Sequence, residues 1–312
     1  MTTTTDPQVR HGLRLAAALP QIMMDDADER IASVYHETQQ SLRVPFVNLI
    51  FRVLANVPDY LIPAWQALGP IVRSVAFEAA ADQLRAHARL EHTPGALDIA
   101  IEDDDRLRGF NDTIHYVLPK LLLVATLLDR AGESRGAGGR DRAPGGNVGQ
   151  FPVGVADDAT KVELVDPDRA SGRVGALFYS IKARHRHPLV SSYFRGLAQW
   201  PDVLEAIWRE LEPFVGSGEY ERRREDLIAR ATALAEALPP LALEGGPFDG
   251  EQGDDVRALL AAFRRKFIPE MLIDAVAIKA MLDGPESATV SRFSVAGGAG
   301  WGKKRTRSVQ PS

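Results

Sequence analysis

Three histidines stand where a base, a metal ligand or a haem ligand would be useful. His185 and His187 lie one residue apart in the stretch RHRHP, and His115 lies three residues before Leu118. An imidazole titrates near neutrality and coordinates metals and haem iron, so each of these roles is open to them. The alternative is that RHRHP forms an exposed basic turn, and no HExxH-type spacing is present. We therefore expect no cofactor and keep a histidine-ligated haem or metal as a minor alternative.

Three consecutive hydroxyl side chains follow this histidine pair. Ser191, Ser192 and Tyr193 could hydrogen-bond a substrate carboxylate, because a hydroxyl both donates and accepts. A helix cap is the alternative role for the serines. A tyrosine phenol has an ordinary pKa near 10, so it is neutral at pH 7 and a poor base unless strongly perturbed.

Two further motifs have simpler structural interpretations. The acidic runs at 25–29 and 102–105 lack the spacing of a calcium loop and suit helix N-terminal ends. The stretch GGAGWGKK at 297–304 resembles a phosphate-binding loop but ends in Lys304 instead of serine or threonine, and no strand precedes it. We interpret it as part of a basic tail.

Composition limits the class of protein that could carry these groups. The 312 residues are 45% hydrophobic and 25% charged, with a net charge of −5. This balance predicts a soluble globular chain and gives no reason to expect nucleic-acid binding. The chain has no cysteine and we detect no signal peptide or membrane span, which together favour a cytoplasmic protein.

Helical spacing dominates the chain, and strand patterns are scarce. The sequence therefore predicts an all-α fold. Its parts are expected to be a loosely ordered N-terminus (1–25), a first helical unit (26–130), a glycine-rich linker (131–160), a second helical unit (161–284) and a basic flexible tail (285–312).

The two helical units share a sequence phrase. RVLANVPDYLIPAWQALGPIV at 52–72 and RGLAQWPDVLEAIWRELEPFV at 195–215 are identical at 10 of 21 positions without a gap. Such self-similarity indicates duplication, so we expect two homologous units packed as an intramolecular pseudo-dimer. Most of the shared residues are interpreted as scaffold, and a pocket is expected between the units.

This arrangement, with SLRVPFVNLIFRVLANVPDYLIPAW in the first half and YFRGLAQWPDVL in the second, resembles the group I DL-2-haloacid dehalogenases. The resemblance covers most of residues 30–283 and implies an all-helical duplicated fold with its site between the repeats. In that family an aspartate activates a water that displaces the halogen directly with inversion. An asparagine assists, and aromatic side chains line the pocket.

Matched position by position, this chain departs from the family pattern. Ser192 matches the serine before the aspartate, but the aspartate position is Tyr193. The asparagine position is Leu118. The pocket tryptophan and phenylalanine become Phe46 and Leu49, so the apolar wall is retained.

We therefore predict a small-molecule pocket, for a ligand that is a small organic acid, in a hydrolase-like protein whose chemistry differs from that of a standard dehalogenase. The alternatives are a non-catalytic binding or scaffold protein and the histidine-ligated protein above. A homodimer remains open, and no nucleic-acid or membrane partner is expected. Candidate catalytic residues are Tyr193, Ser192 and His187. Candidate substrate-binding residues are Phe46, Asn48, Leu49, His115, Leu118 and Ser191.

Overall fold

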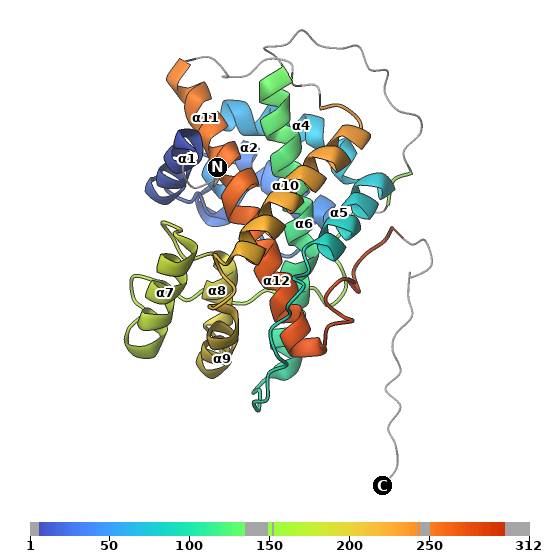
Figure 1. Ribbon diagram of the computed structural model, residues 1–312. Helices are drawn as coiled ribbons and strands as arrows, with labels where there is room; N and C mark the ends of the chain where they lie inside the picture. The colour runs from blue at the N-terminus through green and yellow to red at the C-terminus, as the bar shows by residue number, and fades with distance from the viewer. Residues whose placement is uncertain (1–5, 135–148, 152, 242, 244–249, 297–312) are drawn as a thin grey trace.

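The computed structural model describes residues 6–134, 149–151, 153–241, 243 and 250–296. Helices make up the regular structure of these residues, and the β-type pairing found among them is a single bridge between Ser74 and Gln150 (Figure 1). The all-α class expected from the sequence is therefore confirmed. Among the same residues, none of the helices combines the length and the apolar character that crossing a bilayer requires.

The first half of the chain folds into helices that begin at polar caps. The side chains of Asp6, Asp28 and Ser74 each accept a hydrogen bond from a backbone N–H in the first turn that follows. The elements are α1 (Pro7–Ala18), η2 (Met24–Asp26), α2 (Glu29–Leu42), α3 (Leu49–Leu54), α4 (Pro58–Val72), α5 (Val75–His87) and α6 (Asp104–Ser134).

The second half follows a similar order. Ser191 and Ser217 cap two of its helices with their hydroxyl groups. The elements are α7 (Gly172–His185), α8 (Ser192–Leu197), α9 (Pro201–Leu211), α10 (Gly218–Ala237), α11 (Gly250–Ala262), a turn of π-helix η4 (Phe263–Phe267) and α12 (Ile268–Asp283).

Corresponding helices of the two halves begin 143 positions apart. The pairs are α2 with α7, α3 with α8, α4 with α9 and α5 with α10. Both α2 and α7 end at an arginine in the left-handed region, with φ of 66° at Arg43 and 55° at Arg186. The two halves thus share a backbone irregularity that non-glycine residues seldom adopt.

Side-chain contacts recur at the same spacing. The Trp65 indole N–H donates to Glu37, and that of Trp208 donates to Ser180. The ring of Trp65 meets Phe51 edge-on with centroids 5.7 Å apart, and Trp208 meets Phe194 in the same way at 5.9 Å. The repeated tryptophans therefore tie α4 to α2 and α9 to α7 from within the core.

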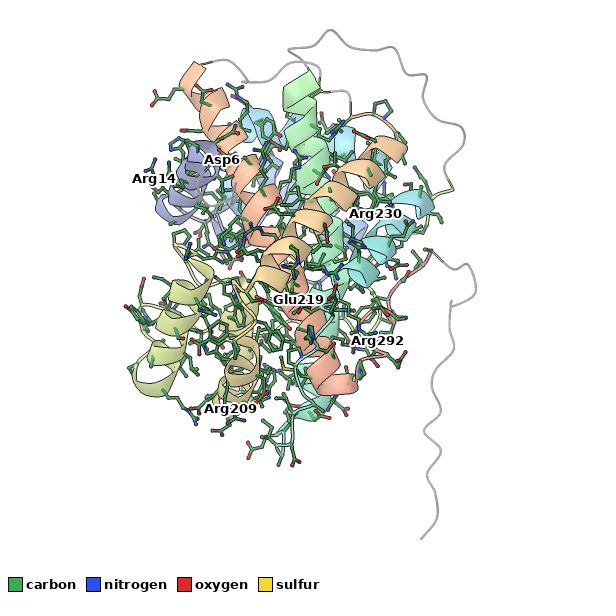
Figure 2. All side chains as sticks on the ribbon, in the orientation of Figure 1. Asp6, Arg14, Arg209, Glu219, Arg230 and Arg292 are labelled. Atoms are coloured by element: carbon green, nitrogen blue, oxygen red, sulfur yellow. The ribbon has the colours of Figure 1, made fainter. Side chains whose placement is uncertain are left out.

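Two long helices form the centre of the molecule. α6 and α12 pack against each other, with α10 beside them (Figure 1). Residues 121–129 of α6 and 268–282 of α12 are all buried, because both helices are covered on every side over these stretches. Glu219 on α10 accepts hydrogen bonds from the backbone N–H groups of Glu91 and His92, linking α10 to the loop after α5 (Figure 2).

The chain ends are more ordered than their composition suggests. Residues 7–18, expected to be loose, form α1, which packs on α11 with Val9 and Leu13 buried. A Cβ on Gly12 would lie 1.8 Å from the carbonyl oxygen of Ala258, so only glycine allows this approach. The expected tail from 285 is packed at Ala288, and residues 297–312 lie outside the described part, as do residues 135–148 and 152 of the expected linker.

Candidate functional site

A cavity of about 660 Å³ lies where segments from both halves meet. Short helices α3 and α8 contribute opposite parts of its wall, and α6 and the π-turn with the start of α12 contribute the rest. The lining comes from η2, residues 46–52, α6, residues 161–164, residues 191–195 and residues 263–271. This volume is typical of a small-molecule pocket.

Seven of the nine residues proposed from the sequence line this cavity. Asn48 and Ser191 occupy equivalent positions, each at the N-cap of its short helix. The hydroxyl of Ser191 accepts from the backbone N–H of Phe194, which is the capping role considered above. The seven are Phe46, Asn48, Leu49, Leu118, Ser191, Ser192 and Tyr193.

The cavity wall also contains Arg52, which the sequence pattern did not single out. Its side chain is buried, with 6% exposed, and its Nη2 donates to Ser192 Oγ at 3.0 Å. Its Nε is buried and has no hydrogen-bond partner among the residues that the structure describes. Burial and, to a smaller extent, the charge of Arg195 lower the pKa of Arg52 to about 10, so the guanidinium is still charged at neutral pH. A buried cation with an unmade hydrogen bond is costly unless an anion completes it.

Arg195 is the counterpart of Arg52, 143 positions later on α8. It lines the same cavity, is half-buried, and donates from Nε to the carbonyl oxygen of Val165 at 3.0 Å. Burial lowers its pKa, and Asp166 and Asp168 oppose that change. The cavity therefore receives one guanidinium from each half.

Tyr193 is held as a neutral donor. Its hydroxyl donates to Asn111 Oδ1, and burial, then the charges of Asp274 and Asp112, raise the pKa of the phenol well above its usual value. Asn111 is fully buried on α6 one turn from the cavity wall. A phenol in this state cannot take a proton from water at neutral pH.

Apolar side chains complete the wall. Phe110, Ile114, Val117 and Leu121 of α6 face Phe267 and its neighbours across the cavity. Spacings of three and four residues on α6 place its four side chains on one face. The site therefore combines a polar end at Arg52 and Ser192 with a predominantly apolar body.

His115 does not line the cavity. Its Nε2 donates to the carbonyl oxygen of Ala288 at 2.7 Å, and the side chain is buried. Burial, followed by the charge of Arg85, lowers the pKa of the imidazole well below its ordinary value. This histidine holds the segment after α12 against α6.

His187 also lies outside the cavity lining, one layer behind it. Its ring stacks on Phe267, which does line the cavity, with centroids 4.3 Å apart, and on His185 at 5.0 Å. Burial lowers the pKa of His187 to about 4, although Glu270 opposes it. Burial also disfavours a charge on His185, but Asp274 and Glu270 outweigh it and raise the pKa of His185 to about 9. At neutral pH the pair therefore carries one positive charge, on His185.

The same cluster contains the types of side chain that bind metal ions. His185, His187 and Glu270 each offer a ligand atom, all within 4.8 Å of one another. However, Lys266 Nζ and Arg224 Nη1 bind the Oε1 atom of Glu270 at 2.5 and 3.1 Å. Two fixed cations on one carboxylate oppose a divalent ion beside it. We interpret the cluster as a buried ion network that fixes the helices behind the cavity.

Comparison with known proteins adds a family context to this geometry. Residues 45–186 match the family model described as halocarboxylic acid dehydrogenase DehI. Over 89% of its length the chain is 29% identical to a configuration-inverting 2-haloacid dehalogenase of Alcaligenes xylosoxydans xylosoxydans, of which the match covers 99%.

Two solved structures share the fold. One is the complex of D-2-haloacid dehalogenase with L-LA, with a TM-score of 0.73 and 19% identity. The other is a D-2-haloacid dehalogenase mutant with D-2-CPA, with a TM-score of 0.70 and 20% identity. Each match covers 85% of this chain and 96% of the other. The chain is thus similar in sequence to the configuration-inverting 2-haloacid dehalogenases, matches the DehI family model over residues 45–186 and shares its all-helical fold with solved structures of D-2-haloacid dehalogenase.

Proposed function

We propose that the cavity binds a small carboxylic acid whose carboxylate is received by Arg52 and Ser192. The observation that carries this proposal is the buried guanidinium of Arg52, which lines the cavity, keeps its charge at neutral pH and has no carboxylate partner among the described residues. A carboxylate is the group that matches a guanidinium best, because it can accept two parallel hydrogen bonds. Ser192 already accepts from Nη2, so its own hydroxyl hydrogen is free to donate to the same ligand.

The remaining lining supports an organic acid as the ligand. The aliphatic and aromatic side chains of α6 and the π-turn would cover the carbon part of such an acid, among them Leu118 and Phe267. Solved structures of similar fold contain L-LA and D-2-CPA. We take these small acids as the starting point for ligands of this chain.

For the chemistry, we propose that this cavity does not perform standard dehalogenation. Among the lining residues that the structure describes, the carboxylates are Asp25 and Glu163, and both are exposed. A water-activating base works best when it is held within hydrogen-bond reach of the reacting centre and has a tuned pKa. Ser192 and Tyr193 are proposed as ligand contacts, and any hydrolysis here would be a diverged reaction. The lack of a buried lining carboxylate equally favours a non-catalytic binding protein.

We infer further that the two halves are copies of one helical unit. Helix starts 143 positions apart, the left-handed arginines and the paired tryptophan contacts support this inference. In a pseudo-dimer of this kind, a central pocket receives equivalent residues from each copy, as Arg52 and Arg195 illustrate.

Calorimetric titration with L-lactate, D-lactate and 2-chloropropionate tests the binding proposal, with methyl lactate as the neutral control. The acids should bind and the ester should not. Arg52→Met should weaken acid binding about tenfold or more, because it removes a charge-assisted hydrogen bond. Arg209→Met removes an exposed arginine and serves as the matched control. Equal binding of acid and ester, or full affinity in Arg52→Met, would refute the proposal.

Halide release from 2-chloropropionate tests the chemical proposal separately. We expect binding without halide release above the buffer rate. Turnover of the halogenated acid by the purified protein would show that another residue supplies the base, and would overturn the claim of diverged chemistry while leaving the binding claim intact.

A further inference from the structure

We propose that the preferred ligand of the cavity is a small dicarboxylic acid, with Arg195 receiving the second carboxylate. This inference rests on the proposed function, since Arg52 and Ser192 are taken to hold the first carboxylate. It goes further by naming the substrate class, which differs from the monocarboxylic 2-haloacids.

The charges on the cavity wall do not balance without a ligand. Arg52, Arg195 and Lys161 all line the cavity. Within the described part of the chain, none of the three has a carboxylate oxygen within 4.0 Å, the limit for an ion pair. The two lining carboxylates, Asp25 and Glu163, are exposed, so water screens them. A monocarboxylate would neutralise one guanidinium, and Arg195 would be left with only the charges of Asp166 and Asp168, which lie beyond ion-pair distance.

The hydrogen bonds that each arginine already makes indicate which of its nitrogens are open. Arg52 donates from Nη2 to Ser192, and no partner for its Nη1 is found among the described residues. Arg195 uses Nε on the carbonyl oxygen of Val165, which fixes its stem, and no partner for its Nη groups is found among the described residues. One nitrogen of each guanidinium is therefore hydrogen-bonded to the protein, and another has no partner among the described residues. The second nitrogen can donate to an anionic ligand.

The two guanidiniums also affect each other. The charge of Arg195 contributes to the lowered pKa of Arg52, so the pair repels within the same partly buried space. A dianion placed between them would relieve this repulsion as well as satisfy both donors, because the attraction in a partly buried site is stronger than in water. The carbon chain joining the two carboxylates would lie against the apolar wall around Phe110 and Leu118.

Lactate and malate provide a matched pair of probes. L-malate is L-lactate with a carboxylate in place of one methyl hydrogen, so the comparison isolates the second anionic group. Calorimetric titration of the full chain at fixed, low ionic strength should give about tenfold or greater tightening for L-malate over L-lactate. Equal affinity for the two acids would overturn the dicarboxylate inference while leaving the proposed function in place. Failure of both acids to bind would overturn the two together.

Variants identify the residue responsible for the difference in affinity between L-malate and L-lactate. Arg195→Met should bring the ratio of malate to lactate affinity toward one, and Arg195→Lys should restore part of it. Arg52→Met should weaken both acids. Lys161→Met removes an exposed cation of the same cavity and should keep most of the ratio. A ratio unchanged in Arg195→Met, or lost equally in Lys161→Met, would exclude a specific contact with Arg195.

Two controls separate a specific dicarboxylate site from unfolding of a variant and from general anion binding. Circular dichroism and melting of each variant show whether a loss of affinity reflects unfolding, and Arg195→Lys retains the charge if the methionine variant does not fold. Inorganic phosphate is titrated as a competing anion. Tighter binding of phosphate than of L-malate would mean that the arginine pair recognises a phosphate group, and would overturn the assignment to a dicarboxylate.

Discussion

Arg52 lines the cavity, and His187 lies one layer behind it. Both side chains are buried, but Arg52 stays protonated at neutral pH whereas His187 is neutral. Arg52 keeps its proton in spite of a lowered pKa, because a guanidinium starts from a very high value. His187 gives up its proton, since burial lowers its pKa to about 4. The charged residue therefore remains available to a ligand, and the neutral one serves as a stacking partner for Phe267.

The neutral state of His187 predicts a pH dependence of stability. The imidazole has an ordinary pKa of 6.5 and a pKa of about 4 in the folded chain. At pH values between these two, His187 binds a proton in the unfolded chain but not in the folded chain. The residue therefore lowers the free energy of unfolding as the pH falls. As the pH falls from 7 to 5, the free energy of unfolding of His187→Phe should rise by about 2 kcal/mol relative to that of wild type.

Urea unfolding of both proteins at the two pH values measures this difference. His36 is exposed on α2, and His36→Gln is the control, which should follow wild type. A constant difference between His187→Phe and wild type across this range would mean that folding does not lower the pKa of His187.

The repeated phrase accounts for why Arg52 was missed in the sequence. Residues shared by the two halves were interpreted as scaffold, and that interpretation suits Trp65 and Trp208, which are buried in the core. Arg52 and Arg195 open the same phrase, yet both line the cavity. Sequence identity between the halves cannot separate a side chain that supports the fold from one that lines the cavity, because both kinds of position occur within the same repeated phrase.

At the scale of elements, the close packing of α8 on α6 positions the second half of the site. A Cβ added to Gly196 would lie 2.3 Å from Cζ of Phe110, which is closer than real contacts allow. Phe110 itself lines the cavity, as do Tyr193 and Arg195 on α8. The absence of a side chain at Gly196 therefore sets how near the α8 residues come to the apolar wall.

Gly196→Ala should displace α8 from α6 and lower the free energy of unfolding by about 1–3 kcal/mol, as overpacking does in cores. Acid binding should weaken as well, because Arg195 and Ser192 move with the helix. Gly95→Ala is the matched control, since a Cβ there meets no atom within 4 Å. Thermal unfolding and lactate titration measure both effects. Wild-type stability in Gly196→Ala would show that the phenylalanine ring can turn aside.

The helices themselves were largely predictable, because their apolar spacing and proline starts are local signals. The helical units expected at 26–130 and 161–284 contain α2 to α5 and α7 to α12, and α6 continues from the first unit to Ser134. The packing of α1 on α11 was not predictable, since a polar segment gives no sign of the distant surface that covers Val9. The buried hydrogen bond from Tyr193 to Asn111 was missed for the same reason, as 82 positions separate its partners.

At the scale of the whole molecule, the cavity joins the two halves, so a ligand should stabilise the entire fold. We expect one cooperative unfolding transition in urea, and L-malate or L-lactate at about 100 times its dissociation constant should raise the free energy of unfolding by about 2.7 kcal/mol. Arg52→Met should show about half of this increase or less at the same ligand concentrations, because a tenfold weaker site is then at about 10 times its dissociation constant. An acid that binds in calorimetry without shifting the transition would have to bind the unfolded chain equally well.

The π-turn at Phe263–Phe267 absorbs one extra residue within the helix that continues into α12. Each residue of an α-helix advances the side chains by about 100°, so the same residues wound at α-helical pitch would rotate all of α12 by about that angle. Glu270 and Asp274 would then turn away from His185, and Met271 would leave the cavity wall. A substitution that straightens the π-turn into α-helix is therefore expected to disturb the buried ion network and the cavity wall together.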